Sequence, residues 1–174
     1  STDAHITLPA LQMATQQSVA RSFNRISVDG DMSTNDMVLV LANGLAGNEE
    51  ITGPAGELYD IFAAALEKLL VTLSKMIVMD GEGATKFVEI RMQGAASEEE
   101  ADRAARAVAN SNLVKTALHG EDANWGRILA AIGYSGITFD PAGVTIHFGD
   151  VPILGRDYAI NFSEEEAKRV LSQR

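Results

Sequence analysis

Cysteine is absent from the 174-residue sequence. Its absence excludes disulfide bonds, metal sites built on thiolates and a cysteine nucleophile within these residues. Basic residues are scarce as well, because 14 lysines and arginines stand against 24 aspartates and glutamates, which gives a formal net charge of −10. Such a charge repels phosphate backbones and anionic lipid surfaces. We therefore expect neither a nucleic acid nor a membrane among the partners.

Long apolar runs are also missing. No stretch approaches the roughly 18 uncharged apolar residues of a membrane helix, and no basic segment leads into an apolar one at the N-terminus, as an export signal would require. The three histidines, His5, His119 and His147, are far apart in the sequence and lack the spacing of metal ligands. The sequence predicts a soluble, cytoplasmic protein without a metal site.

Hydrophobic residues make up 46% of the chain, enough for one sizeable core, and we predict a single domain over residues 1–174. Capping signals and apolar residues at three- to four-residue spacing predict helices, and short apolar runs between turn residues predict strands. The helices are expected at residues 8–23, 58–77, 98–110, 124–132 and 164–173, and the strands at 25–28, 36–42, 86–93 and, as two or three strands, within 137–161. This mixture indicates a layered α/β or α+β fold.

Residues 22–36, with the sequence SFNRISVDGDMSTND, join a helix end, a short strand and a polar turn. The spacing of a calcium loop is matched at its first three ligand positions, by Asp29, Asp31 and Ser33. Thr34 stands where that loop needs glycine, and Val40 where it needs a bidentate glutamate, so a calcium loop is excluded. Two interpretations stay open: a turn whose side chains bind local backbone N–H groups, and direct contact with a substrate.

Glu82 lies between Gly81 and Gly83, after a predicted helix and before a predicted strand. This order excludes a phosphate-binding loop, which needs a strand first and a helix second. The two glycines allow a sharp bend and leave the carboxylate unshielded, so that Glu82 could bind an ammonium group through a charge-assisted hydrogen bond. The alternative is an ordinary exposed glutamate in a loop.

Three segments together resemble one enzyme family: FNRISVDGDMSTND at residues 23–36, NSNLVKTA at 110–117 and NWGRILAAIGYSG at 124–136. They are similar to the ornithine acetyltransferases of arginine biosynthesis, which cleave themselves into two subunits. The resemblance places this chain in the body of the β subunit. It implies helices packed around two stacked mixed sheets, completed by an α subunit from the same precursor in an α2β2 or larger assembly.

The resemblance also implies a reaction, in which acetyl passes from N-acetylornithine to a threonine and then to glutamate, without a metal or prosthetic group. Some members of the family also use acetyl-CoA. Residues 1–4 (STDA) resemble a segment that follows the nucleophilic threonine after a short apolar run, so the nucleophile is expected just upstream of Ser1 and no catalytic residue within this chain. Glu82, in DGEGATKF, occupies the place of a glutamate that binds the ornithine part of the substrate. A C-terminal strand of the family is expected beyond Arg174.

Two other functions remain as alternatives. A related self-processing hydrolase of the aminopeptidase type would use water in place of glutamate as the acetyl acceptor. A non-catalytic assembly subunit would use the apolar stripe between Leu58 and Ile77 to bind a partner, although such a stripe is more typical of core packing.

Overall fold

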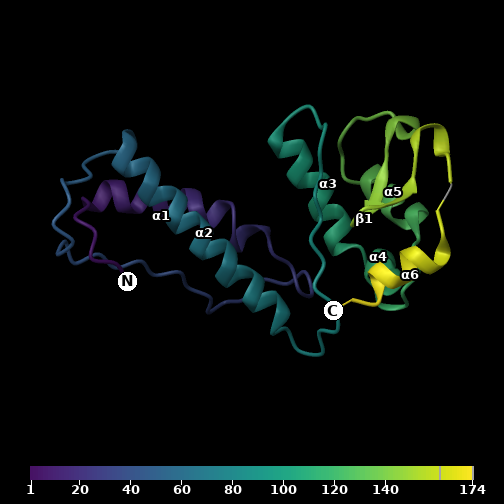
Figure 1. Cartoon of the computed structure of the whole chain (residues 1–174), viewed down its shortest axis with the longest axis horizontal. Coiled ribbons are helices and arrows are strands. Elements are labelled where there is room, and N and C mark those ends of the chain that lie inside the picture. The colour runs from purple at the N-terminus through teal and green to yellow at the C-terminus, as the bar shows by residue number, and fades with distance from the viewer. Residues whose placement is uncertain (161, 174) are drawn as a thin grey trace. The chain divides into compact units, whose positions relative to one another are not determined.

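The computed structural model describes residues 1–160 and 162–173, and the contacts of the chain divide it into two compact units, Ser1–Gly81 and Glu82–Arg174. The first unit holds two helices and the second holds four helices and a hairpin (Figure 1). In chain order the elements are α1 (Leu8–Ala20), the 3-10 turn η1 (Phe23–Arg25), α2 (Glu57–Met79), α3 (Glu98–Asn110), α4 (Asn112–His119), α5 (Trp125–Gly133), η2 (Pro141–Gly143), β1 (Ile146–Phe148), β2 (Val151–Leu154), η3 (Arg156–Tyr158) and α6 (Glu164–Leu171). The single domain expected from the sequence stays a prediction.

The first unit is built on the pairing of α1 with α2. Small residues of α1 allow the two helices to approach closely, since Ala10 and Ala14 are fully buried against Leu66 and Leu70 of α2. Pro9 stands in the first turn of α1, where its missing N–H costs no hydrogen bond. The predicted apolar stripe of α2 is only partly buried. Five of its members remain 40% to 60% exposed, namely Leu58, Ile61, Leu69, Leu73 and Ile77.

The N-terminal segment of the first unit lies parallel to residues 41–51. Thr2 forms a bridge with Ala42, and Ile6 forms one with Ile51. Between the two bridges the Asn48 side chain replaces a backbone partner, because it accepts from the His5 N–H at 2.8 Å and donates to the His5 carbonyl at 3.0 Å. Residues 1–7 are thereby fixed to the loop that precedes α2.

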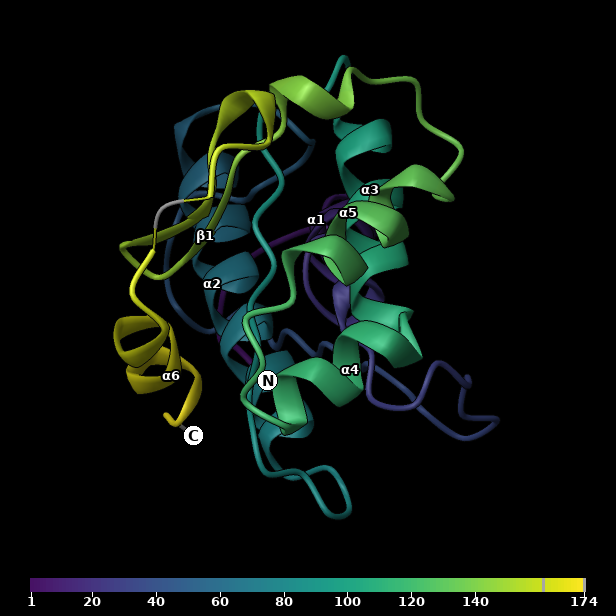
Figure 2. The ribbon, with the colours of Figure 1, turned by 90° about the vertical axis from the view of Figure 1, so that its right-hand side faces the viewer.

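In the second unit, α3, α4 and α5 pack on one another, and α6 packs on the β1–β2 hairpin (Figure 2). The three helices share a core of Ala104, Val108, Val114, Ala131 and Ile132. The hairpin is antiparallel, with Phe148 opposite Val151, and Gly149 has the positive φ of +56° that its tight turn requires. Its core consists of Ile146, Val151, Ile153, Leu154 and Ala167.

Most of the predicted helices are confirmed, and several begin with a side-chain cap. The Ser97 hydroxyl accepts from the Glu100 N–H, Ser163 accepts from Glu166, and Asn124 accepts from Arg127. Each cap satisfies one of the free N–H groups at a helix start. The helix predicted at residues 8–23 ends earlier, at Ala20, and α4 was not anticipated as a separate helix.

The strands predicted at residues 25–28 and 36–42 are wrong. At the first, a 3-10 turn bends the backbone, because the Arg25 N–H donates to the Ser22 carbonyl and the Ile26 N–H to the Phe23 carbonyl. At the second, only Ala42 is paired, through its bridge to Thr2. A strand needs a neighbour along its length, and the described part of the chain supplies no ladder partner to residues 36–40.

The strand predicted at residues 86–93 is also absent, although buried and exposed side chains alternate in part of this segment. Ile90 and Met92 pack on the core of α3, α4 and α5, while Glu89 and Arg91 face solvent. Val88, which precedes Ile90 by two residues, is exposed. Within the described part of the range 137–161, two strands form, β1 and β2, with η2 before them and η3 after them.

The prediction of mixed helices and strands is confirmed. Within residues 1–160 and 162–173, however, the only sheet is the two-stranded hairpin β1–β2. The two stacked sheets and their completion by an α subunit stay predictions.

Lys86, in the segment before α3, binds to the end of α6. Its ammonium donates to the Glu121 carboxylate at 3.1 Å and to the Leu171 carbonyl, and its side chain is only 16% exposed. We expect Lys86→Met to lower the free energy of unfolding by about 2 kcal/mol, because the half-buried carboxylate loses its charged donor. Urea denaturation followed by circular dichroism measures the change.

Arg91→Met is the matched control. The Arg91 side chain is 79% exposed and pairs with Glu89 on the surface, so its removal is expected to cost about 0–1 kcal/mol. Equal losses in the two variants would contradict a special role for Lys86.

Candidate functional site

Glu82 is presented by the turn that ends α2. The helix stops at Met79, the Asp80 N–H still donates to the Met76 carbonyl, and the Gly81 N–H donates to the Val78 carbonyl at 3.2 Å. Gly83 then adopts φ +70°, a left-handed conformation that favours glycine, and redirects the chain. The predicted use of the glycines as a sharp bend is confirmed at Gly83.

The Glu82 side chain is exposed, and its carboxylate contacts no partner among the residues that the structure describes. The cation closest along the sequence, Lys86, is already bound to Glu121. Asp80, in the same turn, is exposed too. Glu82 therefore offers carboxylate oxygens without a partner among the described residues, which suit a ligand ammonium group.

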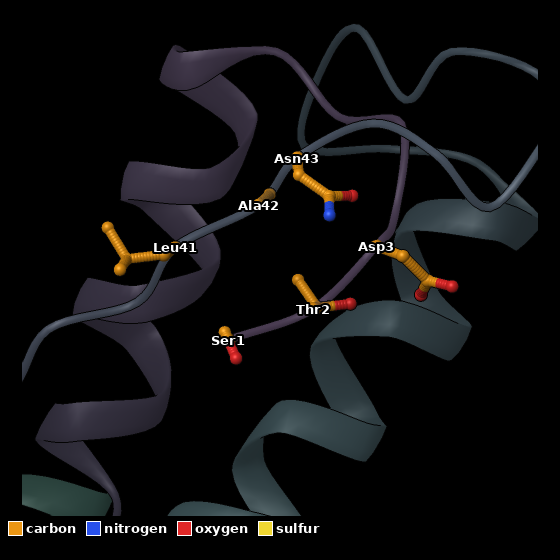
Figure 3. A pocket seen from close by; sticks show the side chains of 6 residues that line it. All are labelled: Ser1, Thr2, Asp3, Leu41, Ala42 and Asn43. Carbon is orange, nitrogen blue, oxygen red and sulfur yellow. The ribbon is translucent and has the colours of Figure 1, made fainter.

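An open hollow of about 390 Å³ lies at the start of the chain (Figure 3). It is lined by Ser1, Thr2, Asp3, Leu41, Ala42 and Asn43. Sequence reasoning did not anticipate residues 41–43 here, because their proximity to Ser1 depends on the parallel pairing of distant segments. The lining holds two hydroxyls, from Ser1 and Thr2, and the Asp3 carboxylate. The expectation that the nucleophile lies upstream of Ser1 stays a prediction.

The polar turn at residues 29–36 forms local hydrogen bonds. The Asp31 N–H donates to the Asp29 carboxylate at 2.9 Å, and the Asn35 N–H donates to the Ser33 hydroxyl at 3.1 Å. The interpretation as a turn held by its own side chains is confirmed. Contact of this turn with a substrate stays a prediction.

The structure does not bring the three histidines together. His5 Nε2 lies 3.4 Å from the Glu50 carboxylate, His119 is the last residue of α4, and His147 lies in β1. Among the described residues, no group of three or more histidine or acidic side chains could hold a metal ion.

A second hollow of about 340 Å³ lies beside α3 and was not predicted. Arg103 and Arg106 line it together with Asn110 and Tyr134. The two arginines are three residues apart on one helix, and this spacing could have predicted from the sequence that their side chains lie on the same face. Both are engaged by acidic neighbours, Arg103 by Glu100 at 3.9 Å and Arg106 by Asp102 at 3.2 Å. These pairs weaken the positive charge that the hollow presents.

None of the helices in the described part of the chain is long and apolar enough to cross a membrane.

Comparison with known proteins gives a consistent result. The model of the ArgJ family matches residues 1–174. The arginine biosynthesis bifunctional protein ArgJ of Symbiobacterium thermophilum is 53% identical over 174 residues, which are 100% of this chain and 43% of that protein. The protein of the same name from Chlorobium chlorochromatii is 53% identical over 173 residues, or 99% of this chain and 40% of its own length. The chain thus spans about two fifths of the length of these curated relatives.

The fold is similar to a solved structure as well. The crystal structure of arginine biosynthesis bifunctional protein argJ from Bacillus halodurans matches with a TM-score of 0.94 and 46% identity. The match covers 99% of this chain and 81% of that one.

Proposed function

Because the chain belongs to the ArgJ family, we propose that the protein of which it forms a part transfers acetyl from N-acetylornithine to glutamate in arginine biosynthesis. The observation that carries the proposal is the match of the family model over all 174 residues. The names of the relatives support it, since they describe bifunctional proteins of arginine biosynthesis.

The proposed chemistry is acyl transfer through a threonine that lies upstream of Ser1. Its hydroxyl attacks the acetyl carbonyl of N-acetylornithine, the C–N bond breaks, and ornithine leaves as the amine after taking up a proton. The amine of glutamate then attacks the threonine ester, which releases N-acetylglutamate and returns the proton to the hydroxyl. These steps exchange only an acetyl group and protons, so they need no metal or prosthetic group. Acetyl-CoA is a second acetyl donor that the same ester intermediate would accept.

Within this chain we assign substrate binding to Glu82. Its carboxylate is exposed, unpaired among the described residues and held in a turn that contains Gly83. Ornithine carries ammonium groups at neutral pH, and a carboxylate binds such a group with a charge-assisted hydrogen bond. Glu82 would thereby orient the acetylated substrate without taking part in bond making.

We further propose that an α subunit from the same precursor completes the fold and the two stacked sheets, in an α2β2 or larger assembly. Large apolar side chains support this, because Met37, Leu39, Leu41, Ile61 and Leu69 are all more than half exposed in this chain. Exposed apolar residues in such number mark an interaction surface. The chain also accounts for only 43% of the length of a relative.

The function is tested by assaying the complete protein with N-acetylornithine, in the presence and the absence of glutamate. A transferase is expected to release ornithine only when glutamate is present and to form N-acetylglutamate in equal amount. Ornithine release at the same rate without glutamate would identify a hydrolase instead. No release under either condition, in a sample whose intact mass shows both subunits, would favour an assembly subunit.

A further inference from the structure

The bridge between Thr2 and Ala42 has the hydrogen bonds of a parallel β ladder. The Thr2 N–H donates to the Leu41 carbonyl at 2.8 Å, and the Asn43 N–H donates to the Thr2 carbonyl at 3.2 Å. Figure 3 shows the two segments side by side, with Ser1 beside Leu41. A parallel ladder repeats this pattern every two residues. The bridge therefore fixes the register of any residue that continues it.

Residues 36–41 have the side-chain pattern of a strand. Val38 and Val40 are half-buried, while Met37, Leu39 and Leu41 are 81%, 68% and 57% exposed. Because Leu41 presents its carbonyl to Thr2, the ladder pattern turns the backbone groups of Leu39 and Leu41 toward the same edge. Within residues 1–160 and 162–173, the N–H groups of Leu39 and Leu41 make no hydrogen bond. An edge of this kind readily accepts another strand.

We propose that the residues immediately before Ser1 in the full-length protein continue this ladder and form a parallel strand along Asp36–Val40. The residue before Ser1 would lie opposite Val40, and the second residue before it opposite Leu39, because the register set by Thr2 and Ala42 is kept. The relatives are more than twice as long as this chain, so their sequences extend beyond it.

The same register locates the start of the upstream strand. Ser1 itself lies opposite Leu41 in this register, so the five residues from Asp36 to Val40 provide room for five residues before Ser1, the first of which lies beside the turn at residues 33–36. This step rests on the proposed function, since it takes the upstream segment to carry the threonine nucleophile. The polar turn of residues 29–36 would then form the wall beside the nucleophile, and its side chains are already held by local hydrogen bonds.

Disulfide trapping in the full-length protein tests the register. Leu39→Cys is combined with replacement of the second residue before Ser1 by cysteine, because residues directly opposite in a ladder are about 5 Å apart at Cα and can form a disulfide. The control combines Leu39→Cys with replacement of the third residue before Ser1, whose side chain points to the other face. Peptide mass spectrometry after mild oxidation is expected to show the bond in the first pair and not in the second.

Hydrogen exchange of the unmodified protein gives a second readout. The amides of Leu39 and Leu41 are expected to exchange at least about tenfold more slowly than those of Val38 and Val40, whose N–H groups point to the opposite edge. Fast exchange at Leu39 and Leu41, a bond in the control pair, or a bond only between two copies of the chain would overturn the proposal. Acetyl transfer is assayed separately on the unmodified protein, so failure of the proposed reaction is distinguishable from failure of the strand.

Discussion

Glu82→Gln is expected to lower kcat/KM for N-acetylornithine by about 10- to 100-fold, mainly through a higher KM. The substitution keeps the size of the side chain but removes the charge that would bind the substrate ammonium group. Because the carboxylate supports no other contact among the described residues, the fold is expected to be unchanged. Initial rates over a range of N-acetylornithine concentrations, together with circular dichroism of the variant, measure both effects.

Asp80→Asn is the matched control for Glu82→Gln. Asp80 is exposed in the same turn, so its substitution removes one negative charge from the same region without touching the proposed contact. We expect its KM to stay within about twofold of the wild type, as for a screened surface charge. Equal increases in KM would indicate a general electrostatic effect, and unchanged kinetics of Glu82→Gln would remove Glu82 from the site.

The helices could be predicted because their signals are local. A capping residue such as Ser97 or Asn124 lies within four residues of the N–H group that it binds, and an apolar stripe is visible within one window of sequence. The end of α3 at Asn110 agrees with the prediction, but the separate helix α4 was missed. Ser111 follows α3 and caps α4 by accepting from the Val114 N–H, a local signal that the sequence analysis did not use.

The strands could not be predicted equally well, because a strand exists only where a partner lies beside it. Residues 36–42 are almost wholly apolar, yet only Ala42 is paired, with a residue 40 positions away. Ile90 and Met92 alternate with exposed neighbours because one side of the segment is buried. This alternation does not require that the segment pairs with another strand. Periodicity in the sequence predicts which side chains are buried, but it does not predict which segment supplies the hydrogen-bond partners of a strand.

The candidate site also has parts that depend on local sequence and parts that depend on long-range pairing. The turn around Glu82 was predictable, since glycines on both sides act on the backbone locally. The hollow at Ser1 was not, because residues 41–43 reach it through long-range pairing. The role of the motif at residues 29–36 was equally hidden. Its hydrogen bonds are local, but its proposed neighbour belongs to the segment before Ser1.

Ile153→Ala is expected to have the largest effect on stability. Ile153 is 1% exposed, and it lies in β2 at the core that the hairpin shares with α6. Removing three buried carbon atoms loses their transfer free energy and leaves a cavity, which together lower the free energy of unfolding by about 3 kcal/mol. The expected result in urea denaturation is a lower midpoint with an unchanged slope.

Ile160→Ala separates burial from residue type, because it makes the same chemical change in the same unit at a side chain that is 54% exposed. Its expected cost is about 0.5 kcal/mol, the usual scale of a surface substitution. A loss as large as that of Ile153→Ala would mean that Ile160 is covered in the purified protein. That outcome would extend the interaction surface of this chain to the second unit, where the α subunit would then be expected to bind.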